Sequence, residues 1–490
     1  MENNENENTT IDSMKEEAVR LEKLKKLSER EVPYKNKFDR THTIENAKIS
    51  LMGTQMKVCG RLVSKRIMGK LIFAHIYDIN GSIQISISKG DYPLAFETFK
   101  EFVDTGDFIG VSGELYTTHI GEITIRVHEL VVLSKALKPL PEKWHGINDI
   151  DLKYRQRYLD LISNEESREI FKTRLKTLSL IRKFLTMNDF IEVETPMLQN
   201  VASGAAAKPF VTKHNALDKE YFLRISPELY LKQVIAGGFD RVFEMNKNFR
   251  NEGMDPSHLQ EFTMLEWYAS YWDYKDNIEF LIKLLQYVIK EVKGSLTFTY
   301  QGQEFDFSKV DYFDYTSEIN SLLGLNILTS DADTLKAKLH EFNIGKSSEI
   351  DGLPSIPAIV DYAFKKTLRP KLIQPTISFN YPAYLIPLAR RNDEDNKLID
   401  MFQLVVNGWE IVKAYSELVN PITQREAFAE QSQNKAAGDD EAFDVDEGFL
   451  TAMEHGFPPM SGLGIGIDRL VSLLCDQPTL RDVILFPIMK

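Results

Sequence analysis

The sequence predicts an α+β protein in which a small β-barrel domain precedes a larger domain of mixed helices and strands. Between residues 56 and 134, short segments of alternating apolar residues are separated by turn residues, which is typical of β-strands. The next segment, KALKPLPEKWHG (135–146), has the proline and glycine content of a linker. Beyond residue 150, long patterns with helical spacing alternate with strand-like segments.

Composition and charge exclude several classes of protein. With 43% hydrophobic and 27% charged residues, the chain is unlike disordered, collagen-like or coiled-coil proteins. No apolar run reaches the roughly 18 residues that span a bilayer, and the N-terminal MENNENENTT lacks the apolar region of a signal peptide. We therefore expect a cytoplasmic protein with no membrane partner, in which Cys59 and Cys475 are free buried thiols.

The net charge of −13 argues against a nucleic-acid partner, but the distribution of charge qualifies that conclusion. Residues 46–77 contain basic side chains and no acidic one. The basic residues are Lys48, Lys57, Arg61, Lys65, Arg66 and Lys70. A solvated face and a contact surface for a phosphate backbone both explain them.

The first elements are a helix and a barrel. Residues 11–31 have apolar positions three and four apart, which predicts an amphipathic helix docked on a domain surface, with a partner-binding arm as the alternative. Strands are predicted at 56–67, 70–78 and 82–88, a helix at 92–103, and strands at 107–118 and 122–133, with turns at Asn80-Gly81 and Ile120-Gly121. This order is typical of a five-stranded oligonucleotide-binding barrel. Phe73, His75 and Gln84 lie on its central strands, where bases would stack.

The second domain is predicted to contain a helix at 166–188, a strand at 190–198 and a helix at 226–238. In the last of these, Ser226 is the expected N-cap, Pro227 opens the first turn and Gly237-Gly238 ends the helix. The acidic segment 435–448 is interpreted as a solvated helix or loop.

A strand–loop–strand pattern at 241–267 concentrates charged residues on its loop. Arg250 lies at the end of the first strand, Glu252, His258 and Glu261 are the other charged residues of the loop, and Phe262 follows the turn. An exposed hairpin with surface ion pairs would explain the pattern. A site for an anionic ligand with a flat base would also explain it, because Arg binds phosphate or carboxylate through two parallel hydrogen bonds.

The segment SGLGIGIDRLVSLL (461–474) resembles a dinucleotide-binding fingerprint, but too little chain follows Gly466 to complete a βαβ unit. Glycines that let the backbone approach a ligand, followed by Arg469 at a helix start, indicate a second phosphate-binding cation. No P-loop and no nucleophile motif is present, so covalent nucleophilic catalysis has no candidate residue.

Together, residues 190–198, 241–267 and 461–474 resemble motifs 1, 2 and 3 of the class II aminoacyl-tRNA synthetases. SKRIMGK, KALKPLPEKWHG, YRQRYLDLI, ISPELYLK and PPMSGLGIGIDRLV resemble the lysyl-tRNA synthetases within that class. The resemblance implies an N-terminal helical extension (1–50), an OB-fold anticodon-binding domain (51–136), a linker (137–160) and a catalytic domain (161–490) with an antiparallel sheet flanked by helices. It also implies a homodimer.

The implied reaction activates L-lysine with ATP and Mg²⁺ to lysyl-adenylate, then transfers lysine to tRNA(Lys). Such chemistry needs positioning and charge neutralisation rather than a nucleophile. The resemblance gives catalytic roles to Arg250 and Arg469. The implied ATP-binding residues are Arg250, Glu252, His258, Phe262, Glu410, Gly466 and Arg469, with Glu410 and position 403 as metal ligands.

The implied lysine-binding residues are Gly204, Glu228, Glu266, Tyr268, Lys413, Tyr415 and Glu417. By the resemblance, Gly204 and Glu228 take the α-amino group, and Glu417 and Tyr268 take the ε-ammonium group. The implied anticodon-binding residues are Arg66, Phe73, Gln84 and Glu122.

Two positions depart from the family pattern. Gln403 stands where the family usually has Glu, and Lys413 stands where it usually has Asn. Together they add two positive charges, the charge of one Mg²⁺, so Lys413 would replace part of an ion's neutralising role. Strand alternation from a turn at Asn407-Gly408 places Lys413 on the face opposite Gln403 unless a bulge intervenes. A Lys413 that points to solvent is the alternative.

Two rival interpretations remain. An aspartyl- or asparaginyl-type synthetase shares the barrel and the motifs, although three acids suit a lysine site better than an aspartate site. A non-catalytic RNA-binding relative would not need Arg250 and Arg469.

Overall fold

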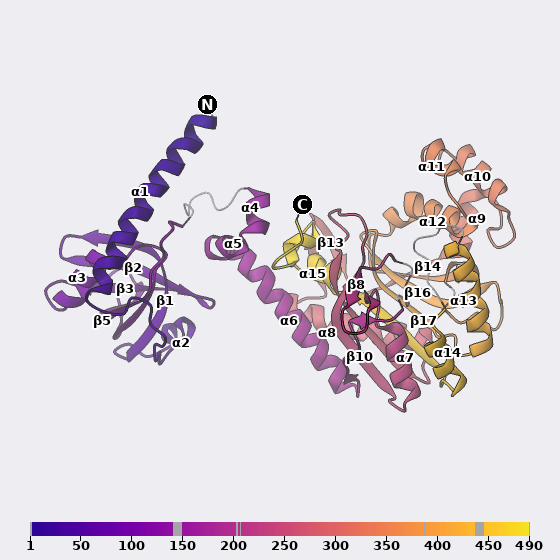
Figure 1. Ribbon diagram of the computed structural model, residues 1–490, viewed down its shortest axis with the longest axis horizontal. Helices are drawn as coiled ribbons and strands as arrows, with labels where there is room; N and C mark the ends of the chain where they lie inside the picture. Colours follow the sequence, from indigo (N-terminus) through magenta and orange to yellow (C-terminus); the bar gives the residue numbers. More distant parts are fainter. Residues whose placement is uncertain are drawn as a thin grey trace. The chain divides into compact units, whose positions relative to one another are not determined.

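The computed structural model describes residues 2–140, 149–201, 204–205, 207–386, 388–436 and 445–489. The chain forms two compact units, Met1–Asn164 and Glu165–Lys490 (Figure 1). The middle of the predicted linker and most of the predicted acidic segment lie outside the described residues. No helix within the described ranges is both long and apolar enough to cross a membrane.

The first unit contains a closed five-stranded barrel with the strand order β1-β2-β3-β5-β4 (Figure 1). Its elements are β1 (Gln55–Met68), β2 (Leu71–Asp78), β3 (Gly81–Ser88), α3 (Pro93–Phe102), β4 (Phe108–Thr117) and β5 (Ile123–Ser134). The predicted order of three strands, a helix and two strands is confirmed. Alternate residues of each strand fill the interior, where Val58, Ile72, Ile85, Val111 and Val127 are fully buried.

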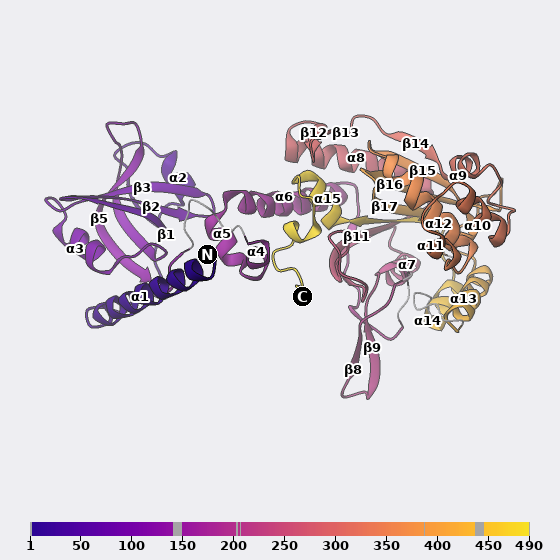
Figure 2. The ribbon, with the colours of Figure 1, turned by 90° about the horizontal axis from the view of Figure 1, so that it is seen from above.

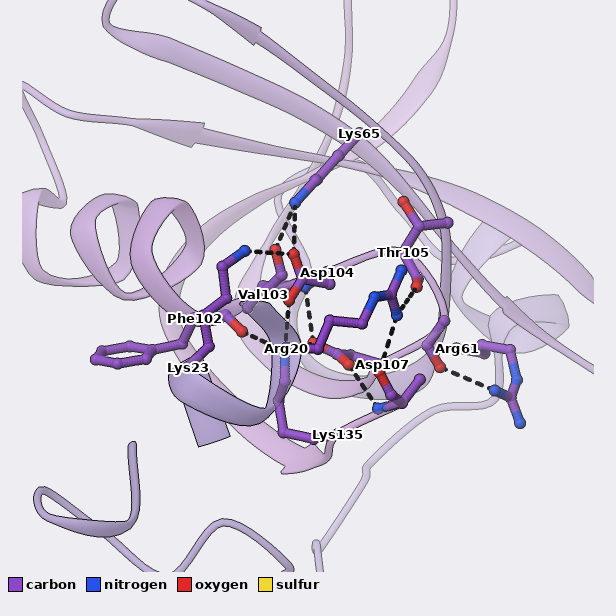
Figure 3. Close-up of polar contacts among 12 residues, drawn as sticks. Arg20, Lys23, Arg61, Lys65, Phe102, Val103, Asp104, Thr105, Asp107 and Lys135 are labelled. Atoms are coloured by element: carbon purple, nitrogen blue, oxygen red, sulfur yellow. Dashed lines mark hydrogen bonds and ion pairs between the residues drawn. The ribbon is translucent and has the colours of Figure 1, made fainter. Parts of the chain in front are cut away.

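The helix α1 (Glu2–Ser28) lies along one side of the barrel (Figure 2). Arg20 is buried and donates to the carbonyl oxygens of Thr105 (2.9 Å) and Ala136 (2.8 Å). Lys23 forms an ion pair with Asp104 at 2.5 Å (Figure 3). Burial raises the pKa of Asp104, but hydrogen bonds from Lys23 and Lys135 outweigh it and lower that pKa to about 2. The prediction that this helix docks on a domain surface is confirmed.

Three shorter helices complete the first unit: α2 (Ile44–Lys48), α4 (Ile150–Arg155) and α5 (Arg157–Ser163).

The second unit is built on an eight-stranded sheet in the order β14-β15-β16-β17-β18-β11-β10-β6. The inner pairings are antiparallel, as the resemblance implies, but both outermost pairings, β14 with β15 and β6 with β10, are parallel. The sheet is therefore mixed. Its strands are β6 (Ile191–Glu192), β10 (Arg241–Phe249), β11 (Glu261–Ser270), β14 (Asp311–Asp314), β15 (Thr376–Pro382), β16 (Leu398–Val406), β17 (Trp409–Ser416) and β18 (Met460–Gly466).

One face of this sheet is covered by α6 (Glu165–Met187), α8 (Tyr274–Lys293) and α15 (Ile467–Leu474), which share one apolar core with it. The remaining helices are α7 (Glu228–Ala236), α9 (Tyr315–Leu323), α10 (Ala332–Glu341), α11 (Ser347–Asp351), α12 (Ile356–Ala363), α13 (Pro421–Ala436) and α14 (Glu447–Glu454). Helices α9 to α12 surround a separate core. Smaller sheets are formed by β12 (Thr297–Tyr300) with β13 (Gln303–Asp306), and by β7 (Leu198–Gln199), β8 (Val211–His214) and β9 (Lys219–Leu223), where β8 and β9 project as a hairpin (Figure 2).

Two predicted elements differ from the structure. The strand predicted at 190–198 shrinks to Ile191–Glu192, because Pro196 cannot donate a ladder hydrogen bond. The N-cap of α7 is Pro227 rather than Ser226. Ser226 still serves the helix start, since its hydroxyl accepts from the backbone N–H of Glu228 at 3.1 Å.

Candidate functional site

The face of the large sheet opposite α6, α8 and α15 carries most of the predicted site residues in two neighbouring rows. In one row, Glu266 on β11 pairs with Gly464 on β18, which pairs with Lys413 on β17, which pairs with Gln403 on β16. In the next row, Tyr268 and Tyr415 flank Gly462 on either side. Because residues two apart on a strand point to the same face, both rows share one surface.

From Gly462 onward, the central strand β18 presents only glycine to this face. Gly462, Gly464 and Gly466 alternate with Leu463 and Ile465, which point into the buried core below. A side chain at Gly462 would overlap the ring of Tyr268 and the carboxylate of Glu417. In the run GLGIG, the apolar side chains point into the core and the three glycines face the other way. The outward surface at Gly462, Gly464 and Gly466 therefore consists of backbone alone, and a ligand can lie against it. We call this surface the glycine floor.

A β-bulge decides where Lys413 lies. Asn407 and Gly408 both have positive φ (52° and 69°), as the predicted two-residue turn requires. The register then shifts, since Val405 pairs with Glu410 but Leu404 pairs with Val412, and Ile411 is the extra residue. Lys413 is thus directly opposite Gln403 on the site face, which simple alternation from the turn does not give.

Lys413 is half-buried, and burial lowers the pKa of its ammonium group, while the charges of Glu410 and Glu228 act in the opposite direction. Its charged neighbours are therefore those of the site. The alternative in which Lys413 points away into solvent is not what the structure has.

Three carboxylates, Glu228, Glu266 and Glu417, gather above the floor; we call them the carboxylate cluster. Each is at most 5% exposed. The hydroxyl of Tyr415 donates to both oxygens of Glu228 (2.9 and 2.8 Å). Ser226 and Tyr268 donate to Glu266 at 2.9 and 3.2 Å. The loop residue Gly204, at φ +91°, lies beside Glu228 and Ser226, so the predicted amino-acid site residues come together.

Burial makes this cluster hard to ionise completely. Burial, together with the charge of Glu228, raises the pKa of Glu266 to about 8. Burial also raises the pKa of Glu417 to about 8, although the cation Lys232 opposes the shift. The cluster is therefore prepared for cationic ligands, because an added positive charge would lower both pKa values.

The two predicted arginines lie at the ends of β10 and β18. The guanidinium of Arg250 lies 5.1 Å from the centre of the Phe262 ring. Burial lowers the pKa of Arg250, and the charges acting on it include Glu252, Glu266, Glu410 and Arg469. Arg469, on the first turn of α15 next to Gly466, donates to the carbonyl oxygen of Glu410 at 2.6 Å. Arg250 thus lies near Glu266 of the carboxylate cluster, and Arg469 lies near Arg250 and Glu410.

The loop between β10 and β11 is more exposed. Glu252 is exposed, and His258 binds Asp255 through Nδ1 at 2.7 Å. Asp255 and His258 therefore form a hydrogen-bonded pair on the exposed loop. Phe262 is at the base of the loop, opposite Asn248.

A metal site made only of protein ligands does not occur here: no group of three or more His, Cys, Asp and Glu side chains within the described ranges could hold a metal. Gln403 is engaged as an acceptor of the Tyr381 hydroxyl at 2.9 Å. Glu410 is thus the one carboxylate of the two predicted ligand positions, and a single carboxylate would suit Mg²⁺ that is bound mainly through phosphate oxygens.

In the barrel, the predicted anticodon residues are also brought together. Arg66 on β1 is directly opposite Phe73 on β2. Gln84 donates to Glu122 at 2.6 Å, and its own carbonyl accepts from Thr124 at 2.7 Å. His75 on β2 pairs with Gln84 on β3, and its Nε2 lies 2.9 Å from Oε1 of Glu122.

The basic residues of segment 46–77 are partly used within the barrel. Arg61 donates to the carbonyl oxygen of Gly106, and Lys65 donates to that of Val103 at 2.6 Å (Figure 3). Arg66 remains exposed on β1. The solvated or phosphate-binding surface is therefore smaller than the residue count indicates.

Three residues of the site were not among those predicted: Ser226, Lys232 and Gly462. Lys232 has a sequence signal, since it follows Glu228 by four positions and so shares its helix face. Gly462 also has one, because it begins a strict alternation of glycine with apolar residues. Ser226 was expected only as a helix cap.

Comparison with known protein families gives two matches along the chain. Residues 149–490 match the family model "tRNA synthetases class II (D, K and N)", and residues 56–133 match "OB-fold nucleic acid binding domain". The chain belongs to the class II tRNA synthetases of this subgroup.

Individual relatives narrow the assignment. Lysine–tRNA ligase of Pelotomaculum thermopropionicum is 45% identical over 481 residues, which cover 96% of this chain and 94% of the relative. That of Aquifex aeolicus is 47% identical, covering 89% of this chain and 73% of the relative, and that of Enterobacter sp. is 43% identical, covering 98% and 97%. Within the class, the chain is a member of the lysine–tRNA ligase family.

Proposed function

We propose that this chain attaches L-lysine to the 3′ end of tRNA(Lys) in two steps, through lysyl-adenylate, with release of diphosphate and then AMP. The observation that supports it best is the carboxylate cluster above a glycine floor. Three buried acids side by side are costly unless cations join them. A free lysine brings two ammonium groups, whereas aspartate or asparagine would need a basic residue there.

In the first step, the substrate carboxylate attacks the α-phosphorus of ATP, and diphosphate leaves. The protein's task is to orient the two reactants and neutralise charge. Arg250 would bind between carboxylate and α-phosphate, and Arg469, held by the Glu410 carbonyl oxygen, would bind the γ-phosphate. Phe262 would stack on adenine, taking up the ring face that Arg250 now contacts. Glu252 and His258 would contact ATP from the exposed loop, and Gly466 would admit it close to the backbone.

Lysine itself would lie on the floor between β11 and β17. Glu228 and the backbone at Gly204 would take the α-amino group, and Glu417 with Tyr268 would take the ε-ammonium group. Glu417 is suited to this because its Oε1 is buried and has no partner within the part of the chain that the structure describes. Glu266, Lys413 and Tyr415 line the same surface.

Enzymes of this class generally use Mg²⁺, which neutralises phosphate charge when bound. In this chain Glu410 would be its protein ligand. Gln403 would contribute only if the hydrogen bond from Tyr381 were exchanged. Lys413, opposite Gln403, would supply positive charge of its own to the same region.

The barrel would read the anticodon. Phe73 would stack on a base, Gln84 and Glu122 would present a defined pattern of donors and acceptors, and Arg66 would bind the backbone. Since ATP and tRNA are the substrates, the reaction is expected in the cytoplasm.

We also propose a homodimer. Apolar side chains remain exposed on α6, β6 and β7, including Leu175 (64% exposed), Met187 (70%), Ile191 (50%) and Leu198 (47%). Burial of such a surface between two copies would be favourable. Sedimentation of the purified protein tests this, and a monomer at micromolar concentration would contradict it.

The decisive experiment is ATP–pyrophosphate exchange driven by lysine, aspartate or asparagine separately. We expect exchange with lysine alone, and exchange with aspartate or asparagine alone would identify a rival synthetase. Gly462→Ala should abolish the lysine-dependent reaction, because its methyl group would collide with Tyr268 and Glu417. Gly464→Ala tests the floor itself, since its methyl group would meet Glu266 at an ordinary 3.7 Å and would enter the ligand space without a collision inside the protein. Full lysine-dependent exchange by Gly464→Ala would argue against a ligand on this floor.

A further inference from the structure

The carboxylate cluster already contains a lysine side chain of the protein. Lys232 lies one turn after Glu228 on α7 and is 1% exposed. Its Nζ donates to Oε1 of Glu228 at 2.6 Å and forms an ion pair with Oε2 of Glu417. The rings of Tyr268 and Tyr415 lie within 6.0 Å of the same ammonium group. An ammonium group thus sits permanently beside the position proposed for the substrate's own.

The two oxygens of Glu417 differ because of Lys232. Both oxygens are buried and accept no hydrogen bond within the described part of the chain, but Oε2 is the oxygen in ion-pair contact with the Lys232 ammonium group. Oε1 faces the space above Gly462, next to the Tyr268 ring. Held by one oxygen, the carboxylate has a fixed direction, and its free oxygen points to the ligand floor.

Lys232 also changes the charge of the site. The carboxylate cluster carries three negative charges when ionised, and Lys232 offsets one of them. Arg250, which acts on Glu266, and Lys413, which interacts with Glu228, add further positive charge. A site with three uncompensated carboxylates would instead take up a proton.

We propose that Lys232 is a positioning residue that determines the amino-acid selectivity of this site. It binds Glu417 through one oxygen, favours the ionised form of that carboxylate and leaves the other oxygen for the terminal ammonium group of the substrate. The inference rests on the proposed function, because it assigns a role in recognising lysine.

Removal of the Lys232 charge should raise the pKa of Glu417 further and leave less of this carboxylate ionised near neutral pH. Burial, together with Glu228 and Glu266, raises this pKa to about 8, and Lys232 is the cation that opposes the shift. The titratable groups that face Lys232 and the cluster are Glu228 on α7, Glu266 and Tyr268 on β11, Tyr415 and Lys413 on β17, and Glu417. A protonated Glu417 accepts a cation poorly but tolerates an apolar chain end.

The test compares Lys232→Met and Lys232→Arg in the full-length protein. Lys213→Met is the control, because it removes an exposed lysine that pairs with Asp218 on the surface of the β8–β9 hairpin. Amino-acid-dependent pyrophosphate exchange is measured from pH 6.5 to 8.5 with lysine and with norleucine, which has the same chain without the ε-ammonium group. For Lys232→Met we expect KM for lysine to rise about tenfold or more at pH 7, the cost of a lost hydrogen bond to a charged group. The increase should shrink as pH rises, and the preference for lysine over norleucine should fall.

Lys232→Arg should keep the wild-type pH profile and lysine preference, whatever its overall rate. If Lys232→Met raises KM equally at every pH, or weakens lysine and norleucine alike, Lys232 is only structural and the proposal is wrong. Should Lys232→Met fail to fold in a thermal unfolding assay, Lys232→Gln removes the same charge while retaining a donor for Glu228. If the wild-type protein itself shows no lysine-dependent exchange, the proposed function fails rather than the role of Lys232.

Discussion

Replacement of Glu266 by Gln tests how protons and lysine compete for the carboxylate cluster. Burial and the neighbouring Glu228 raise the pKa of Glu266 to about 8. A cationic substrate binds the ionised carboxylate, so the proton must leave before lysine is bound. Binding should therefore strengthen as pH rises to about 8 and level off above it.

The size of the effect follows from the raised pKa. Each pH unit below 8 lowers the ionised fraction of Glu266 about tenfold, which corresponds to about 1.4 kcal/mol of binding free energy. We expect log KM for lysine to fall with a slope of about −1 between pH 6 and 8. The slope should approach about −2 if Glu417, whose pKa is also raised to about 8, titrates independently.

Glu266→Gln mimics the protonated carboxyl at every pH. Its KM for lysine should equal that of the wild type near pH 6, lose one unit of slope, and so exceed the wild-type value by roughly a hundredfold at pH 8.5. Lysine-dependent exchange over this pH range provides the measurement, with the exposed Glu304→Gln as the matched control. A wild-type KM that is flat from pH 6 to 8, or a variant that is equally impaired at all pH values, would refute the reasoning.

Three further predictions concern the other parts of the site. Arg250→Ala should lower exchange by about 10²–10³-fold, because it removes a cation from the developing charge, while Arg182→Ala, which removes a half-buried arginine paired with Glu192, should not; wild-type exchange in the Arg250 variant would exclude this role. Phe73→Ala should weaken tRNA charging but leave exchange intact, and equal loss in both assays would indicate a structural role for the ring. Lys413→Asn should require more Mg²⁺ for half-maximal exchange, and the double variant with Gln403→Glu should recover; identical Mg²⁺ titrations of the three proteins would show that the two departures are unrelated.

The sequence predicted elements correctly where one local rule, such as strand alternation, was enough to determine the structure. Alternation and turn residues predicted the five barrel strands and their turns, because a half-buried strand has a period of two wherever it pairs. Alternation failed at Ile411, where one extra residue reverses the faces, and no local signal in the sequence marks a bulge. The β-like composition of residues 190–198 also predicted a longer strand than the structure has. Composition does not show whether a neighbouring strand is available for pairing along the whole segment.

The same distinction between local patterns and tertiary structure applies to the site residues. The motif residues were found because each belongs to a local pattern, and the sheet register brings Glu266, Gly464, Lys413 and Gln403 into one row. Lys232 was missed because a lysine at an i, i+4 position from a glutamate is usually a surface pair. Only the tertiary structure, which buries that helix face against β11 and β17, turns this pair into part of the ligand site.

The last strand of the large sheet in the chain, β18, is inserted between β11 and β17. During synthesis, β11 and β17 are therefore made before residues 460–466, which form β18. Neither strand can pair along the edge that β18 occupies before those residues are available. Until then, both present unpaired strand edges, which invite pairing with other chains. Such non-local pairing is slow and leaves incomplete chains prone to aggregation. A chain truncated before Met460 would lose the glycine floor together with the strand that joins β11 to β17. Interrupted translation should therefore give no partly active product.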